Sequence, residues 1–211
     1  MLVCAFKKRS VIRVIRHHTQ QSLRRNWWLG LALVAILTSG CATTASFTAV
    51  DTASVNRLLG LIKERLDVAP EVARSKWNTK APIEDPLRDK QIVDEVSKSA
   101  AEYGLEPEVA RAFFTGQIEA SKVVQNALHA EWTATGQPSF AKVADLAMDI
   151  RPALDRLAPA LMRALAEALP VLRQRGGRRL LEAQARAIVA NAPGGEASVR
   201  HAVAPLLALS R

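Results

Sequence analysis

The stretch Val55–Leu66 reads VNRLLGLIKERL and has the apolar spacing of a helix that buries one side. Apolar residues recur there at i, i+3, i+4, i+7 and i+11, namely Val55, Leu58, Leu59, Ile62 and Leu66. We expect Asp51 or Thr52 to cap this helix. Pro70 falls inside the continuing pattern and should kink or restart the helix, because proline lacks the backbone donor that a helix interior uses.

Further helices are expected wherever apolar residues keep helical spacing between breaks. These helices are residues 85–103, closed by Gly104, residues 107–132, a long helix with leucines from Leu154 to Leu169, and two shorter ones set apart by RQRGGRR (173–179) and NAPGGEAS (191–198). No stretch of useful length alternates with the period of two that a strand requires. The sequence therefore predicts an all-α domain of about six helices.

Residues 1–41 have the composition of an export signal. They hold seven of the 29 Lys and Arg residues and no acid. Their apolar run WWLGLALVAIL (27–37) is shorter than the roughly 20 residues that a membrane-spanning helix needs. We predict a signal peptide over residues 1–41 and a periplasmic or secreted protein, with a single membrane anchor as the alternative. Cys41 is a candidate lipid-modified cysteine, and simple cleavage after a small residue such as Ala42 is the other possibility.

The basic charge of the chain is concentrated in this leader. The formal net charge is +9, but 22 basic residues face 20 acidic residues downstream of residue 41. That balance does not offer the basic surface by which proteins bind nucleic acid. The other cysteine, Cys4, lies in the leader, so no intrachain disulfide can form in the exported chain. We expect one domain over residues 42–211, in which 52–155 carry the motifs and 156–211 form accessory helices.

Candidate site residues are cations, hydroxyls and amides on helices. No metal-ligand spacing, phosphate-binding loop or nucleophile signature is present, and we predict neither a metal nor a cofactor. Arg65 and Lys76 are eleven positions apart, which places them on one face of an unkinked helix. By residue type alone, both would be solvated surface cations. Ser121 and Gln125 share a helical face and extend a polar line back to Gln117.

The segment KWNTKAPIEDPLR, from Lys76 to Arg88, favours a functional site over solvated surface residues. It resembles the signature of the AroQ class of chorismate mutases, and most closely the exported, gamma-type branch of that class. The resemblance continues in order through ERL ending at Leu66, QIEAS (117–121), Gln125, Glu131-Trp132 and RPALD (151–155). It covers about residues 52–155, and beyond them only the helical character matches.

The resemblance implies a clamp for the two carboxylates of chorismate. Arg65, Arg88 and Arg151 would hold them, with Ser121 assisting. In the intracellular dimeric branch one arginine comes from the neighbouring chain, whereas the exported branch takes it from its own fourth helix, where Arg151 is the candidate. A site built in this way within one chain does not require a partner, and both a monomer and a homodimer stay open.

The resemblance also implies roles around the reacting atoms. Lys76 and Gln125 would face the ether oxygen, and Asp89 would accept a hydrogen bond from the substrate hydroxyl. Asp85 would support the start of the second helix, where the backbone meets the ligand. Ile92 stands where a relative has an amide that reaches the substrate. Some exported relatives staple the C-terminal helices with a disulfide, which this chain cannot do.

The implied reaction needs no nucleophile, because chorismate rearranges to prephenate by a unimolecular [3,3] shift. The protein selects the compact conformer and stabilises the negative charge that grows on the ether oxygen. Two other functions stay open. One is an isochorismate-pyruvate lyase, which uses the same fold and a similar cationic pocket, and the other is a non-enzymatic periplasmic helical lipoprotein.

Overall fold

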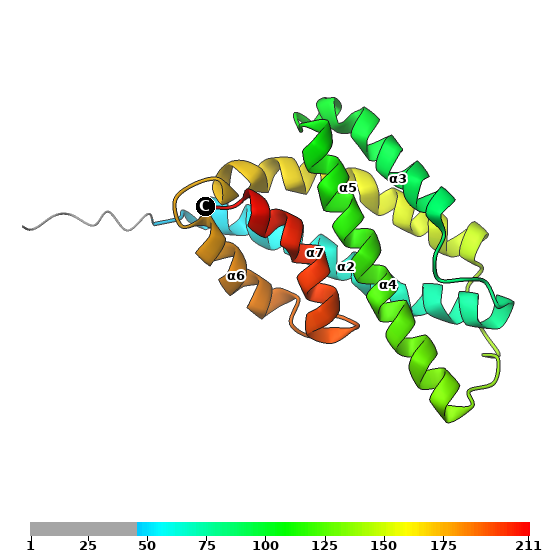
Figure 1. Cartoon of the computed structure of the whole chain (residues 1–211). Helices are drawn as coiled ribbons and strands as arrows, with labels where there is room; N and C mark the ends of the chain where they lie inside the picture. The colour runs from blue at the N-terminus through cyan, green and yellow to red at the C-terminus, as the bar shows by residue number, and fades with distance from the viewer. Residues whose placement is uncertain (1–45) are drawn as a thin grey trace, which may run out of the picture. The chain divides into compact units, whose positions relative to one another are not determined.

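The computed structural model describes residues 46–211, which fold into a helical domain, while the leader and Cys41 lie outside the described residues (Figure 1). Its elements are α2 (Ala49–Thr79), α3 (Pro86–Ser99), the 3-10 turn η1 (Ala100–Tyr103), α4 (Pro107–Thr135), the π-helical turn η2 (Leu146–Ile150), α5 (Arg151–Leu172), α6 (Gly177–Ile188) and α7 (Gly195–Leu209). Six α-helices and no strand among these residues confirm the predicted all-α class. None of these helices has the length and hydropathy that crossing a membrane requires.

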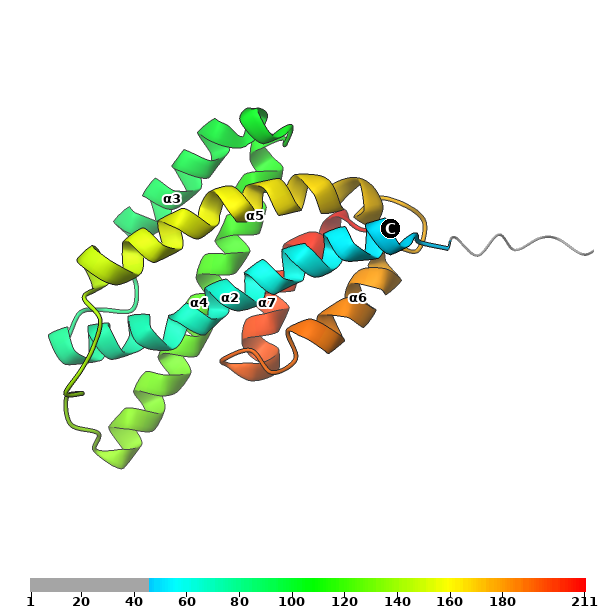
Figure 2. The same ribbon diagram turned by 180° about the vertical axis from the view of Figure 1, so that it is seen from behind.

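Helix α2 is the central element of the core. It packs against both α4 and α5, and α5 runs along it in Figure 2. The five apolar residues of the Val55–Leu66 pattern are all buried, with at most 1% of their surface exposed. Helix α3 packs mainly on α4, and α7 packs on α4 as well. The helices α2, α3, α4 and α5 thus meet around one region, where the candidate site lies.

The start of α2 differs from the expected one. Thr48 is the N-cap: its hydroxyl accepts from the Asp51 backbone N–H at 3.1 Å, and the Asp51 carboxylate accepts from the Thr48 N–H at 2.9 Å. This reciprocal capping box places Asp51 at the third helical position, so the prediction of Asp51 or Thr52 as the cap is wrong. Of the kink or restart predicted at Pro70, the restart is wrong, because α2 continues through Pro70 to Thr79.

The boundaries of α3 and α4 follow the predicted caps. The Asp85 side chain accepts from the Arg88 backbone N–H at 3.2 Å, and Pro86 opens the helix. At the far end, η1 tightens the last turn and Gly104 closes it at φ 71°. Helix α4 begins at Pro107, as expected, and continues to Thr135, three residues past the predicted end. The Asp85 cap therefore fixes where α3 begins, and with it the backbone positions of Arg88 and Asp89.

The accessory helix α7 is held against α4 by close packing instead of a disulfide, while α6 packs mainly on α2. A Cβ atom built on Gly116 of α4 would lie 2.7 Å from Pro205 Cγ and 2.8 Å from the backbone oxygen of His201, both on α7. One residue further along, Gln117 donates from Nε2 to the backbone oxygen of Ala202 at 2.9 Å. Only glycine at position 116 lets the two helices approach so closely.

Two glycine-to-alanine variants test this packing, because we expect them to change the free energy of unfolding in opposite directions. Gly116→Ala should lower the free energy of unfolding by about 1–2 kcal/mol, because overpacking outweighs the better helix propensity of alanine. Gly60→Ala on α2 meets nothing within 4 Å and should raise it by about 0.5–1 kcal/mol. Thermal unfolding followed by circular dichroism measures both, and stabilisation by both variants would contradict the close approach.

Candidate active site

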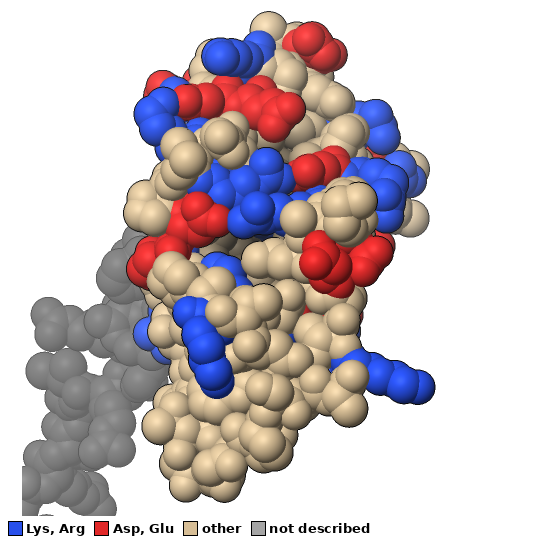
Figure 3. Space-filling model, turned by 90° about the vertical axis from the view of Figure 1, so that its right-hand side faces the viewer, with Lys and Arg blue, Asp and Glu red and all other residues tan. Residues whose placement is uncertain are grey.

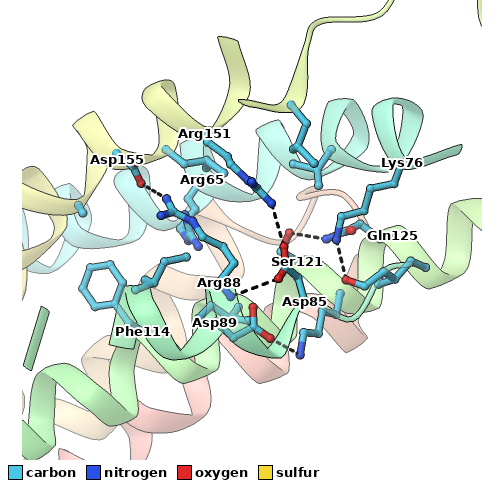
Figure 4. Close-up of a pocket in the computed structure, with 18 residues that line it drawn as sticks. Arg65, Lys76, Asp85, Arg88, Asp89, Phe114, Ser121, Gln125, Arg151 and Asp155 are labelled. Atoms are coloured by element: carbon cyan, nitrogen blue, oxygen red, sulfur yellow. Dashed lines mark hydrogen bonds and ion pairs between the residues drawn. The ribbon is translucent and has the colours of Figure 1, made fainter. Parts of the chain in front are cut away.

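A pocket opens between α2, α3, α4 and the N-terminal half of α5, and polar side chains from all four helices point into it (Figure 4). Every residue that the sequence nominated lies in its wall: Arg65, Lys76, Asp85, Arg88, Asp89, Ser121, Gln125 and Arg151. The apolar part of the wall includes Val72, Ile92, Phe114 and Leu154. Residues that are up to 86 positions apart in the sequence thus surround one space.

Arg65 and Lys76 are buried cations. Each has only 7% of its surface exposed, so the expectation from residue type, two solvated side chains, is wrong. Burial lowers the pKa of Arg65 to about 10, although the nearby Asp155 raises it and Arg88 lowers it further. Burial likewise lowers the pKa of Lys76 below its ordinary value, against the opposing effect of Asp85. Both cations line the pocket and are themselves shielded from solvent, which strengthens the effect of their charge.

The hydrogen bonds of these two cations leave donors without a partner among the described residues. Lys76 donates from Nζ to the backbone oxygen of Ile83 at 2.6 Å, which fixes the ammonium group while two of its three donors stay available. Arg65 Nε has no hydrogen-bond partner among the described residues, although it is fully buried. A buried guanidinium donor without a partner costs free energy, and a bound anion would satisfy it.

Arg88 and Arg151 are paired with carboxylates across helix boundaries. Arg88 lies 2.6 Å from Asp155 of α5, and Arg151 at the start of α5 lies 2.8 Å from Asp85 at the start of α3 (Figure 4). These ion pairs tie the start of α3 to α5. They also hold both guanidinium groups at the pocket wall, where another carboxylate can replace an aspartate in bidentate contact.

The amide and hydroxyl on α4 form one unit. Gln125 donates from Nε2 to the Ser121 hydroxyl at 3.1 Å, and its Oε1 is buried with no partner among residues 46–211. Gln117, which the sequence placed on the same polar line, turns away from the pocket and contacts α7. Each step of four residues rotates about 40° around a helix, so Gln117 is displaced about 80° from Gln125.

Two charged wall residues were given no role in the sequence analysis. Lys122 of α4 reaches the pocket and pairs with three carboxylates, and Asp155 is the partner of Arg88. A signal for each exists in hindsight: Asp155 follows Arg151 at i+4, and Lys122 precedes Gln125 by three positions, so both share a helical face with a nominated residue. Ile92 also lines the pocket, and its side chain carries no donor.

The charge of the wall suits an anion with two negative charges. Arg65, Lys76, Arg88, Lys122 and Arg151 supply five positive charges against three carboxylates at Asp85, Asp89 and Asp155. Elsewhere the surface is mixed, and Figure 3 shows Lys and Arg side chains interleaved with acidic ones on one face. Within residues 46–211, no three His, Cys, Asp or Glu side chains are placed to hold a metal ion. The wall can therefore bind and orient a dicarboxylate and donate hydrogen bonds to it.

Comparison with known proteins gives a consistent result. Residues 55–126 match the family model for chorismate mutase type II. A secreted chorismate mutase of Mycolicibacterium smegmatis is 29% identical over 173 residues, which are 82% of this chain and 94% of the relative.

Solved structures agree over most of their length. The crystal structure of chorismate mutase from Burkholderia thailandensis is 34% identical with a TM-score of 0.68, and the match covers 73% of this chain and 99% of that one. The enzyme from Burkholderia phymatum gives a TM-score of 0.69 at 30% identity, covering 75% and 98%. With this identity over almost the whole of both structures, the chain belongs to the chorismate mutase type II family.

Proposed function

We propose that this chain catalyses the rearrangement of chorismate to prephenate. The observation that carries the proposal is the wall of one pocket, in which three arginines, a buried lysine and a glutamine amide converge. Chorismate is a dianion, and the wall carries two more positive than negative charges. The names of the relatives, secreted and crystallised chorismate mutases, support the same activity.

The arginines hold the two carboxylates of the substrate in this proposal. Arg88 and Arg151 exchange Asp155 and Asp85 for substrate oxygens, and Arg65 uses the donor that has no partner among the described residues. Ser121 assists from α4. Fixing both carboxylates selects the compact conformer in which the enolpyruvyl arm lies over the ring, which removes much of the entropic barrier. Planar guanidinium groups suit this task because they grip carboxylates bidentately.

Lys76 and Gln125 act at the ether oxygen. Breaking of the C–O bond runs ahead of bond formation, so negative charge grows on this oxygen in the transition state. An ammonium group and an amide N–H aimed at it stabilise the transition state more than the substrate, which raises the rate. Asp89 accepts a hydrogen bond from the ring hydroxyl, and Asp85 supports the start of α3, where the backbone meets the ligand.

The pH dependence distinguishes an amide from an acid at position 125. Gln125 needs no proton in order to donate, so we expect wild-type activity to hold from mildly acidic to mildly basic pH. It should fall only as Lys76 loses its proton, at a pH below the ordinary lysine value because burial lowers the pKa of Lys76. Gln125→Glu should lose activity by about tenfold or more between pH 5 and pH 8, because only a protonated Glu donates. A wild-type rate that fell steeply above pH 6 would contradict this role.

The test is incubation of the purified protein with chorismate and, separately, with isochorismate, followed by identification of the products. Formation of prephenate from chorismate is the expected result. Salicylate and pyruvate from isochorismate, with chorismate unchanged, would assign the chain to the lyase reaction instead. Absence of both products would favour a non-enzymatic helical protein.

The leader supports export of the enzyme. We infer that residues 1–41 are a signal peptide and that 42–211 form the exported domain, and the relatives named secreted agree with this. Fractionation of cells that express the full chain should locate the shortened protein in the periplasm or the medium. Retention on the membrane that Cys41→Ala abolishes would identify a lipid anchor at Cys41.

A further inference from the structure

Lys122 has an unusual set of partners for a residue without an assigned role. Its Nζ lies 2.8 Å from Asp89, 2.7 Å from Glu84 and 3.1 Å from Glu119. Only 12% of the lysine side chain is exposed. Burial opposes its charge, but the hydrogen bonds to Asp89, Glu84 and Glu119 outweigh burial and raise the pKa of Lys122 above its ordinary value. Lys122 therefore stays protonated at any pH at which the protein works.

The pair with Asp89 is the best protected of the three. The Asp89 side chain is 26% exposed, whereas Glu119 is 46% and Glu84 is 63% exposed. Solvent screens the two glutamates, so their pairs contribute little, and the enclosed Asp89 pair is the strongest electrostatic contact of Lys122. Asp89 and Lys122 also both line the pocket, while neither glutamate does.

The start of α3 depends on such contacts for its position. Val96 is the only residue of α3 that is buried, and Ile92 packs on the core in part, so the first turn before Ile92 has no apolar side chain in the core. Arg88 and Asp85 tie this end to α5, and the Asp89 pair ties it to α4. Without Lys122, the Asp89 carboxylate would lose its charge-assisted contact with α4 and would no longer be held in one orientation.

We infer that Lys122 is a positioning residue that holds the Asp89 carboxylate in the orientation that accepts a hydrogen bond from the ring hydroxyl of the substrate. The inference rests on the proposed function. The hydroxyl takes no part in bond making or breaking, so its contact has equal strength in the ground state and the transition state. Loss of such a contact raises KM and leaves kcat almost unchanged.

The experiment compares chorismate with its analogue that lacks the ring hydroxyl, using Lys122→Met in the otherwise intact protein. KM for chorismate should rise about tenfold, with kcat within about twofold. For the analogue, which has no hydroxyl to lose, kcat should stay unchanged and KM should rise much less than for chorismate, only by the effect of one positive charge fewer in the wall. Lys122→Arg keeps the charge and should restore KM to within about threefold of wild type. The matched control is Lys63→Met, which breaks an exposed pair with Asp67 on α2 and should change nothing.

Several outcomes would overturn the inference. Equal losses with both substrates, or an unchanged KM for chorismate, would reduce Lys122 to a structural link between α3 and α4. Should Lys122→Met fail to fold, the double variant Asp89→Asn, Lys122→Met removes both charges together. The kcat and KM of the double variant for chorismate should match those of Asp89→Asn alone. A further rise in KM would mean that Lys122 does not act through Asp89. A wild-type protein inactive on chorismate would instead refute the proposed function.

Discussion

Replacing Lys76 by alanine is expected to lower kcat by about 100- to 1000-fold, the cost of removing one donor at a developing oxyanion. Lys76 is buried in the pocket wall, and its only hydrogen bond to a described residue goes to the Ile83 backbone oxygen. Lys76 lines the pocket, and in the proposed function its remaining donors bind the ether oxygen. Because the charge on that oxygen appears in the transition state, kcat should fall much more than KM rises.

Single-turnover kinetics with chorismate would measure this effect, and Lys63→Ala, an exposed lysine on the same helix, is the matched control. The variant must also remain folded. Since burial lowers the pKa of Lys76 in the folded chain, the unfolded chain binds more protons between the two pKa values, so the buried charge costs stability at neutral pH. Lys76→Met should therefore raise the free energy of unfolding at neutral pH. Full activity of Lys76→Ala or Lys76→Met would rule out a role of Lys76 at the ether oxygen.

Replacing Arg88 by alanine should lower kcat/KM for chorismate by about 100-fold, because a bidentate, charge-assisted contact with a carboxylate is lost. Both KM and kcat should change. KM rises with weaker binding, and kcat falls because the substrate samples extended conformers in the pocket. Arg88→Lys keeps the charge but not the planar fork, so it should recover only part of the rate.

Steady-state kinetics of Arg88→Ala, Arg88→Lys and wild type would measure this. The control is Arg200→Ala, because Arg200 is an exposed arginine on α7 whose pair with Glu196 lies outside the pocket wall. We expect its kinetics to match wild type. If Arg88→Ala were as active as Arg200→Ala, Arg88 would serve only to tie α3 to Asp155.

The helices could be predicted because their signals are local. The apolar spacing of Val55–Leu66, the Asp85-Pro86 start and the glycine at 104 act through neighbours on the same turn or two. The error at the first cap has the same origin. Thr48 and Asp51 form a pair three residues apart, and the sequence alone offers Asp51 as an equally good cap.

The site could be predicted only as far as the family resemblance reached. Burial of Arg65 and Lys76 depends on α3, α4 and α5 closing over α2, which no spacing within α2 reveals. Arg88 and Asp155 are separated by 67 positions, so their contact exists only in the folded chain. Lys122 was missed for a similar reason, because its partner Glu84 lies in the connection before α3 and its partner Asp89 lies on α3.

The rate of prephenate formation from chorismate by the purified wild-type protein is the most direct test of the central claim. An enzyme with this pocket should accelerate the reaction by about a millionfold over the reaction in water, without an added metal or cofactor. The account predicts that this activity co-purifies with the protein and falls with Lys76→Ala. No conversion of chorismate by folded wild-type protein would contradict it.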